Sequence, residues 1–236
     1  MLELTERFTT KAAVLALAAG FFATSASAVV TYPGPFAGVD VTYTDVEESS
    51  ADPANDPEPL YGAPAILPAN ILDFDPSANA FAASSPAPDT TDGTLRFMIA
   101  SNTAAPISTL VVRESGDFAF TGATSNGELV AATLLVHILD ATTEAVLLQQ
   151  QATFSEAYDQ TPSEAGNWSN EVSIDLSALG RTEYKVLINN LLQATGTGPA
   201  TAFIRKKDFQ IDVPEPASAL LALSGGLMLL RRRQSA

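Results

Sequence analysis

The sequence predicts an all-β protein: a single antiparallel β-sandwich, jelly-roll-like, flanked by an N-terminal signal helix and a C-terminal transmembrane-like helix. The first observation behind this prediction is a period-two alternation of apolar and polar residues, which is typical of strands with one buried and one solvated face. The second is that turn residues separate these segments without helical periods between them, which disfavours a βαβ fold. The third is that no internal repeat is visible, which disfavours a solenoid.

The alternation predicts about nine strands. It is clearest where Val172, Ile174 and Leu176 alternate with polar residues. In chain order, the predicted strands lie at 39–43, 95–99, 110–114, 117–121, 129–140, 145–154, 171–176, 184–192 and 201–213.

Three glycine dipeptides predict turns. Asp92-Gly93 should precede one strand, Ser115-Gly116 should close a hairpin, and Asn126-Gly127 should lead into the run at 129–140. Because that run is apolar on both faces, we expect it to be a central strand. A return strand should follow at 145–154.

Two segments are predicted to be loops of one exported domain that spans residues 29–213. Residues 47–68 hold five prolines among acidic residues, which excludes a central strand and predicts a Pro-rich acidic loop on the surface. Residues 78–92 are rich in Ala, Ser, Thr and Pro, and are also expected to form a loop.

The N-terminus has the layout of a secretory signal peptide, residues 1–28. A polar leader is followed by an uncharged, mostly apolar run at 12–23, which is too short for a membrane-spanning helix. Ala26 and Ala28 are the small residues expected at the −3 and −1 positions of a cleavage site. The secretion machinery and signal peptidase are therefore predicted partners, and the chain is expected to be exported.

The charge of the chain argues against nucleic acid as a partner. The formal net charge is −15, and residues 29–213 alone hold 24 acidic against 7 basic side chains. Binding to phosphates needs a Lys/Arg-rich surface. The chain also has no cysteine, so disulfides, thiol catalysis and Cys-ligated zinc are excluded.

No catalytic constellation stands out, and the chain is predicted not to be an enzyme. His137, the only histidine, lies in the apolar run 134–139 without a Gly-x-Ser-x-Gly motif, which favours a histidine in the core or at a strand edge. A secreted hydrolase remains the third reading. Glycoside hydrolysis needs two facing carboxyl groups, and nothing in the sequence selects such a pair.

No cofactor is expected, and calcium is the one ion for which the sequence offers ligands. Asp73, Asp75, Asp89 and Asp92 carry the oxygen atoms that calcium prefers, although their spacing does not match the helix–loop–helix calcium motif. The alternative is that these side chains cap turns.

Trp168 and Tyr158 are the candidate contacts for a sugar. Trp168 lies in the polar stretch 164–170, where an exposed indole would stack its apolar face on a sugar ring, with Tyr158 close by in sequence. The alternative is a Trp that closes one end of the sandwich core.

The C-terminus has three parts: Pro214-Glu215-Pro216, an uncharged segment at 217–230, and Arg231, Arg232 and Arg233. As a helix, the uncharged segment would rise about 21 Å. A bilayer's hydrocarbon core is roughly 30 Å thick, so the segment is marginal as a permanent anchor. The arginines would act as a membrane stop on the cytoplasmic side.

This tripartite segment resembles the PEP-CTERM sorting signal of Gram-negative and related bacteria, a motif also labelled an ice-binding-protein C-terminal domain. The resemblance covers about a tenth of the chain. It implies recognition by an exosortase, transient membrane insertion through the apolar helix, and processing near Pro214, Glu215 and Pro216. It does not imply ice binding.

We therefore expect an exported protein of the cell surface or extracellular matrix, sorted through this signal. The alternative is a carbohydrate-binding module associated with exopolysaccharide. A hydrolase is the weakest of the three hypotheses, because no catalytic pair is identifiable.

Overall fold

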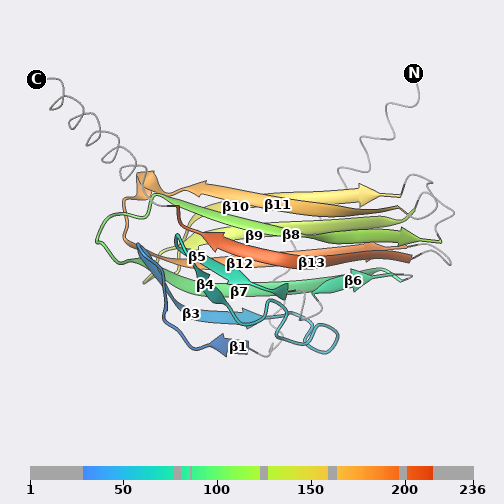
Figure 1. Ribbon diagram of the computed structural model, residues 1–236, viewed down its shortest axis with the longest axis horizontal. Coiled ribbons are helices and arrows are strands. Elements are labelled where there is room, and N and C mark those ends of the chain that lie inside the picture. The colour runs from blue at the N-terminus through green and yellow to red at the C-terminus, as the bar shows by residue number, and fades with distance from the viewer. Residues whose placement is uncertain are drawn as a thin grey trace, which may run out of the picture.

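The fold is a sandwich of two antiparallel sheets (Figure 1). The computed structural model describes residues 29–76, 81–85, 87–122, 127–158, 164–196 and 201–214. Within them lie thirteen strands and one short 3-10 helix, Ser177–Leu179. The predicted all-β class and the single antiparallel sandwich are confirmed. The predicted signal and transmembrane-like helices fall outside the described residues.

The seven-stranded sheet is ordered β1-β3-β7-β12-β9-β10, with β2 paired to β3. Its members are β1 (Val29–Tyr32), β2 (Phe36–Ala37), β3 (Val41–Ser49), β7 (Asp89–Ser101), β9 (Leu129–Leu139), β10 (Val146–Ala157) and β12 (Glu183–Thr195). β9 lies between β12 and β10, as the apolar character of both its faces predicted.

The six-stranded sheet is ordered β11-β8-β13-β5-β4, with β6 paired to β13. Its members are β4 (Ala65–Leu67), β5 (Ile71–Phe74), β6 (Ala82–Ser84), β8 (Thr109–Thr121), β11 (Ala165–Asp175) and β13 (Thr201–Asp212). In Figure 1 this sheet lies in front of the seven-stranded one.

The two sheets enclose one hydrophobic core, built from the inward half of each alternating strand. In β11, Val172 and Ile174 are buried while Ser173 between them is exposed. The burial of these alternate side chains on both sheets supplies the main driving force for folding.

Most connections between the long strands pass from one sheet to the other. The chain alternates between sheets through β7, β8 and β9, forms the β9–β10 hairpin, and alternates again through β11, β12 and β13. The turn predicted at Asn126-Gly127 therefore lies on a crossover from β8 to β9, although Asn126 itself is outside the described residues.

Two of the predicted glycine turns are wrong. Asp92-Gly93 lies inside β7, and Ser115-Gly116 lies inside β8. A Cβ at Gly93 would lie 2.6 Å from the Phe81 ring, and one at Gly116 would lie 1.8 Å from the Arg205 carbonyl oxygen. Both glycines serve close approach within the core rather than a reversal of the chain.

The Pro-rich segment 47–68 is only partly a loop. Its first residues belong to β3 and 65–67 form β4, while 50–64 contain no helix or strand. This stretch is anchored to the core, because the buried Glu48 carboxylate accepts hydrogen bonds from the backbone N–H groups of Leu60 and Tyr61. The Tyr32 hydroxyl donates to the same carboxylate at 2.6 Å.

Candidate functional site

The structure buries both residues proposed as sugar contacts. Residues 165–170 are strand β11 rather than a loop, and Trp168 points inward with 3% of its surface exposed. Its ring stacks on Phe154, with centroids 6.0 Å apart, and its Nε1 donates to the Arg205 carbonyl at 3.1 Å. Tyr158 is buried against Phe120. Neither ring presents a face to a ligand in this conformation.

His137 and the proposed calcium ligands do not form a common site. His137 lies half-buried on β9, where burial lowers the pKa of its imidazole. Asp73 on β5 accepts a hydrogen bond from Gln210, and Asp92 on β7 accepts one from the Ala51 amide. Among the described residues, no three His, Cys, Asp or Glu side chains converge as they would around a metal ion.

The targeting motifs are mostly beyond the described part of the chain. Pro214 is its last residue, while Glu215, Pro216, the basic Arg231–Arg233 and the cleavage residues Ala26 and Ala28 lie outside it. Within the described ranges, no helix has the length and apolar character needed to cross a bilayer.

The most unusual feature of the sandwich is a charged pair in the middle of its core. Nζ of Lys206 on β13 lies 2.7 Å from Oε2 of Glu114 on β8, and both side chains have 0% of their surface exposed. A buried charge is costly unless it is paired and hydrogen-bonded. The pair is therefore a candidate for a special role.

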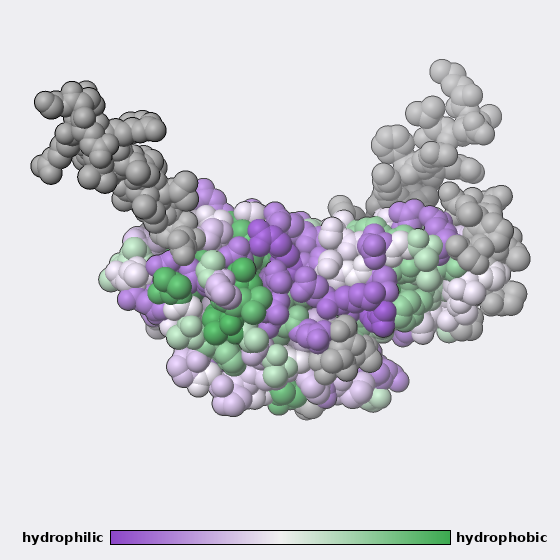
Figure 2. Space-filling view, in the orientation of Figure 1, coloured by the Kyte–Doolittle hydropathy of each residue, from purple (hydrophilic) through white to green (hydrophobic). Residues whose placement is uncertain are grey.

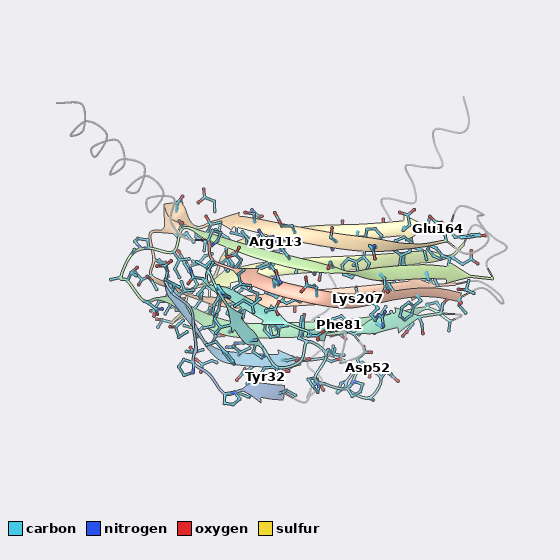
Figure 3. All side chains as sticks on the ribbon, in the orientation of Figure 1. Tyr32, Asp52, Phe81, Arg113, Glu164 and Lys207 are labelled. Carbon is cyan, nitrogen blue, oxygen red and sulfur yellow. The ribbon has the colours of Figure 1, made fainter. Side chains whose placement is uncertain are left out.

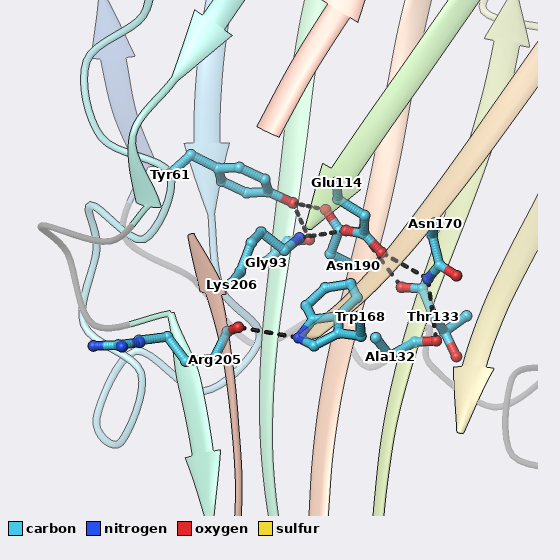
Figure 4. Close-up of polar contacts among 10 residues, drawn as sticks. All are labelled: Tyr61, Gly93, Glu114, Ala132, Thr133, Trp168, Asn170, Asn190, Arg205 and Lys206. Carbon is cyan, nitrogen blue, oxygen red and sulfur yellow. Dashed lines mark hydrogen bonds and ion pairs between the residues drawn. The ribbon is translucent and has the colours of Figure 1, made fainter. Parts of the chain in front are cut away.

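Two asparagines and a tyrosine complete this buried polar cluster (Figure 4). Nδ2 of Asn190, on β12, donates to Glu114 Oε2 at 2.7 Å, and Nδ2 of Asn170, on β11, donates to Oε1 at 2.9 Å. The Tyr61 hydroxyl lies 2.7 Å from Asn190 Oδ1 and 3.0 Å from the Gly93 carbonyl. The cluster thus connects both sheets and the anchored loop.

Aromatic rings surround the Lys206 ammonium. Nζ lies 4.3 Å from the ring centroid of Phe81, 5.0 Å from that of Phe209 and 5.2 Å from that of Tyr61. Such cation–π contacts compensate part of the lost hydration. Burial nevertheless outweighs the attraction of Glu114, and the pKa of Lys206 is lowered from its usual value.

The sequence contains a partial signal for this cluster. Strand alternation places Glu114 with Val112, Asn170 with Val172, and Asn190 with Ile188 on the core face. Lys206 is harder to place, because the register of β13 against β8 shifts between Lys206 and Asp208. Alternation from Ala202 and Ile204 turns Lys206 inward, whereas alternation from Phe209 would have turned Lys207 inward. The bulge lets both Lys206 and Phe209 face the core.

A second candidate site is a surface hollow of about 380 Å³ at one end of the six-stranded sheet. Outward-facing Phe203 of β13 and Ala165 of β11 flank the small Ala119 of β8, and the paired Asn167 and Asp117 also line the hollow. The face seen in Figure 2 is hydrophilic over its middle, with apolar residues toward both ends.

Beside this hollow, the Asp117 carboxylate is contacted by two basic side chains, Arg205 and Lys207. Both Arg205 Nε and Nη2 donate to its carboxylate, at 3.2 and 3.0 Å, and Lys207 Nζ lies 2.6 Å away. Figure 3 shows Lys207 and Arg113 along the same sheet. Burial opposes ionisation of Asp117, but the contacts with Arg205 and Lys207 outweigh it and lower its pKa.

No protein-family model matches the chain, and no curated protein matches its sequence. Solved structures give distant fold matches. One chain of the infectious bursal disease virus Gt strain is 10% identical over 80% of this chain and 33% of its own, with a TM-score of 0.28. The present chain thus spans about a third of that viral chain.

Two further matches are a module solved with a sugar and a lectin. The module TmCBM61, solved with β-1,4-galactotriose, is 12% identical over 81% of this chain and 90% of its own, with a TM-score of 0.22. Lectin II from Ulex europaeus is 10% identical over 78% and 98%, with a TM-score of 0.25. The likeness is weak and concerns the chain path alone.

Proposed function

We propose that this chain is an exported cell-surface or extracellular-matrix protein, delivered by a signal peptide and sorted by an exosortase through a PEP-CTERM signal. The observation that carries the proposal is the extent of the fold. All thirteen strands of the described residues lie between Val29 and Asp212, which is the stretch that the sequence places between the two predicted processing points. The orders β5-β13-β8-β11 and β7-β12-β9-β10, with crossovers between sheets, support a jelly-roll-like topology for this body.

The test is the mass of the mature protein, purified from surface and medium fractions of native cells. We expect a form that begins at Val29 and has lost the segment after the Pro-Glu-Pro motif. Replacing Pro214, Glu215 and Pro216 with alanine should leave the protein in the membrane fraction. An intact C-terminal segment on mature surface protein would refute the processing step.

A second candidate function is carbohydrate binding at the hollow beside Phe203. The half-buried Phe203 ring lies among the polar side chains of Asn167 and Asp117, and sugars bind where an apolar ring adjoins fixed hydrogen-bonding groups. This hollow takes the place of the sugar contacts predicted at Trp168 and Tyr158, because both of those side chains are buried in the core. The proposal needs no catalytic residue, and the protein would act by binding alone.

Binding to polysaccharide isolated from native cells tests this function. Phe203→Ala and Asn167→Ala should each weaken retention on the immobilised polysaccharide at least tenfold. Thr153→Ala, an exposed position on β10 of the opposite sheet, is the matched control and should bind as the wild type does. Unchanged retention by both hollow variants would exclude this site.

A further inference from the structure

The buried polar cluster brings an amine and a carboxamide to the same carboxylate oxygen. Lys206 Nζ and Asn190 Nδ2 each lie 2.7 Å from Glu114 Oε2. The amine and the side-chain amide therefore lie within twice that distance of each other. They come from β13 and β12, which belong to different sheets, and Figure 4 shows them converging on Glu114.

The amine of Lys206 is short of hydrogen-bond partners. An ammonium group has three protons to donate. Among the described residues, Nζ has no acceptor in hydrogen-bond geometry, and Glu114 Oε2 is its ion-pair partner by distance. Three aromatic rings also surround Nζ, and burial favours the uncharged amine, which is a nucleophile.

We propose that Lys206 and Asn190 form an intramolecular isopeptide bond, with Glu114 as the group that carries the protons. Nζ of Lys206 attacks Cγ of Asn190. The Nζ–Cγ bond forms, the Cγ–Nδ2 bond breaks, and the amide nitrogen leaves as ammonia.

All proton transfers in this reaction take place among these three residues. Lys206 first gives a proton to the Glu114 carboxylate, which converts the ion pair into a neutral pair. After attack, Glu114 gives its proton to the departing Nδ2 and takes one from Nζ. The products are a secondary amide, a protonated Glu114 and one molecule of ammonia, and no oxidant or added reactant is needed.

Tyr61 lies where it would assist this attack. Its hydroxyl is 2.7 Å from Oδ1 of Asn190, the oxygen on which negative charge develops as Cγ becomes tetrahedral. A preorganised donor in a water-excluded site stabilises such charge strongly. Tyr61 is itself fixed by the core, since it is fully buried and packs edge-on to Phe81 and Phe209.

Asn190 is the acceptor rather than Asn170. Asn170 donates to the other carboxylate oxygen, Oε1, at 2.9 Å, and lies 3.4 Å from the Ala132 carbonyl. It is therefore a positioning residue that orients the Glu114 carboxylate. Only Asn190 shares an oxygen with the amine and has its carbonyl next to Tyr61.

The bond would tie the two sheets together across the core. A covalent link between β12 and β13 would limit separation of the sheets and reduce the freedom of the unfolded chain, as a disulfide does. The sequence contains no cysteine, so a disulfide is not available to this body. An amide link also resists reduction, which suits any redox environment.

The test compares intact masses of folded, full-length proteins prepared in parallel. The wild type should be lighter than its own sequence requires by the mass of one ammonia. Lys206→Arg and Glu114→Gln should each have the full mass for their sequence. Lys207→Arg, which changes the exposed neighbouring lysine, is the matched control and should keep the loss. Tyr61→Phe should acquire the loss more slowly.

Peptide mapping identifies the bond itself. Proteolysis should release one branched peptide that joins the segment containing Lys206 to the segment containing Asn190. A folded wild-type protein with its full mass would overturn the proposal, and this measurement does not depend on whether any variant folds. A link to Asn170, or to a lysine other than Lys206, would overturn the assignment of the acceptor or of the nucleophile.

Discussion

Gly116 lies directly against the backbone of Arg205: a Cβ at residue 116 would be 1.8 Å from the Arg205 carbonyl oxygen. The same oxygen accepts the indole hydrogen bond of Trp168 at 3.1 Å. Strands β8, β11 and β13 are thus packed so closely at this point that no side chain fits, and the bulge that follows Lys206 begins here.

Gly116→Ala should therefore destabilise the protein by about 3 kcal/mol or more, since the clash is with backbone that cannot move freely. Urea unfolding measures the loss. Gly180→Ala is the comparison, because a Cβ there meets nothing within 4 Å and only the positive φ of 60° opposes it. It should cost about 1–2 kcal/mol. Equal losses for the two variants would contradict the close approach.

Trp168→Ala should cost about 3–5 kcal/mol of unfolding free energy, because it opens a cavity beside Phe154 and removes the indole donor. Trp168→Phe should cost less, since much of the packing is kept. Circular dichroism follows the unfolding of these variants. A loss below about 1 kcal/mol for Trp168→Ala, typical of an exposed residue, would disagree with its buried position.

Tyr32→Phe should destabilise the protein by about 1–3 kcal/mol, because it removes a hydroxyl donor from the buried Glu48 carboxylate. A double-mutant cycle with Glu48→Gln checks the pairing, as the loss from Tyr32→Phe should shrink when residue 48 is uncharged. Fully additive losses would show that the two side chains do not interact.

Asp56→Asn should change how stability depends on pH. Burial raises the pKa of Asp56 to about 6, despite hydrogen bonds from Thr91 and the Asp92 amide. The unfolded carboxyl has a pKa of about 3.9. The raised folded pKa contributes stability that is fully present below about pH 4 and is lost as the pH rises through about 6.

The wild type should therefore lose stability relative to Asp56→Asn between pH 4 and pH 7, by at most about 2 kcal/mol after solvent screening. Thermal unfolding of both proteins across this range measures the difference. A difference that stays constant with pH would show that Asp56 does not titrate as the structure indicates.

The alternation of apolar and polar residues predicted much of the fold. Alternation in 171–176 correctly identified a core-facing strand, and the apolar run at 129–140 correctly identified a strand with neighbours on both sides. Glycine was a poorer guide. A glycine beside a polar residue is equally suited to a turn and to a close contact inside a strand, and Gly93 and Gly116 are of the second kind.

The candidate site was only partly predictable. Alternation alone assigns Glu114, Asn170 and Asn190 to the interior. It therefore indicates a buried polar cluster, which the composition of the chain does not reveal. Trp168 was predicted to be a surface contact because it lies among polar residues. Those neighbours are the outward-facing residues of the same strand, and Trp168 itself faces inward. Lys206 continues the alternation of Ala202 and Ile204, but alternation from Phe209 would select Lys207 instead, and the sequence does not show the bulge that separates the two patterns.

By itself, the sequence determined the all-β class, the single sandwich and the acidic character of its surface, because alternation and charge are local properties of the chain. Only the tertiary structure decided that Lys206, Glu114 and Asn190 share one point in the core. These residues come from three strands in two sheets. Strand pairing, register and the bulge together determine that their side chains lie in contact. Such a meeting depends on contacts between distant segments, which no local pattern specifies.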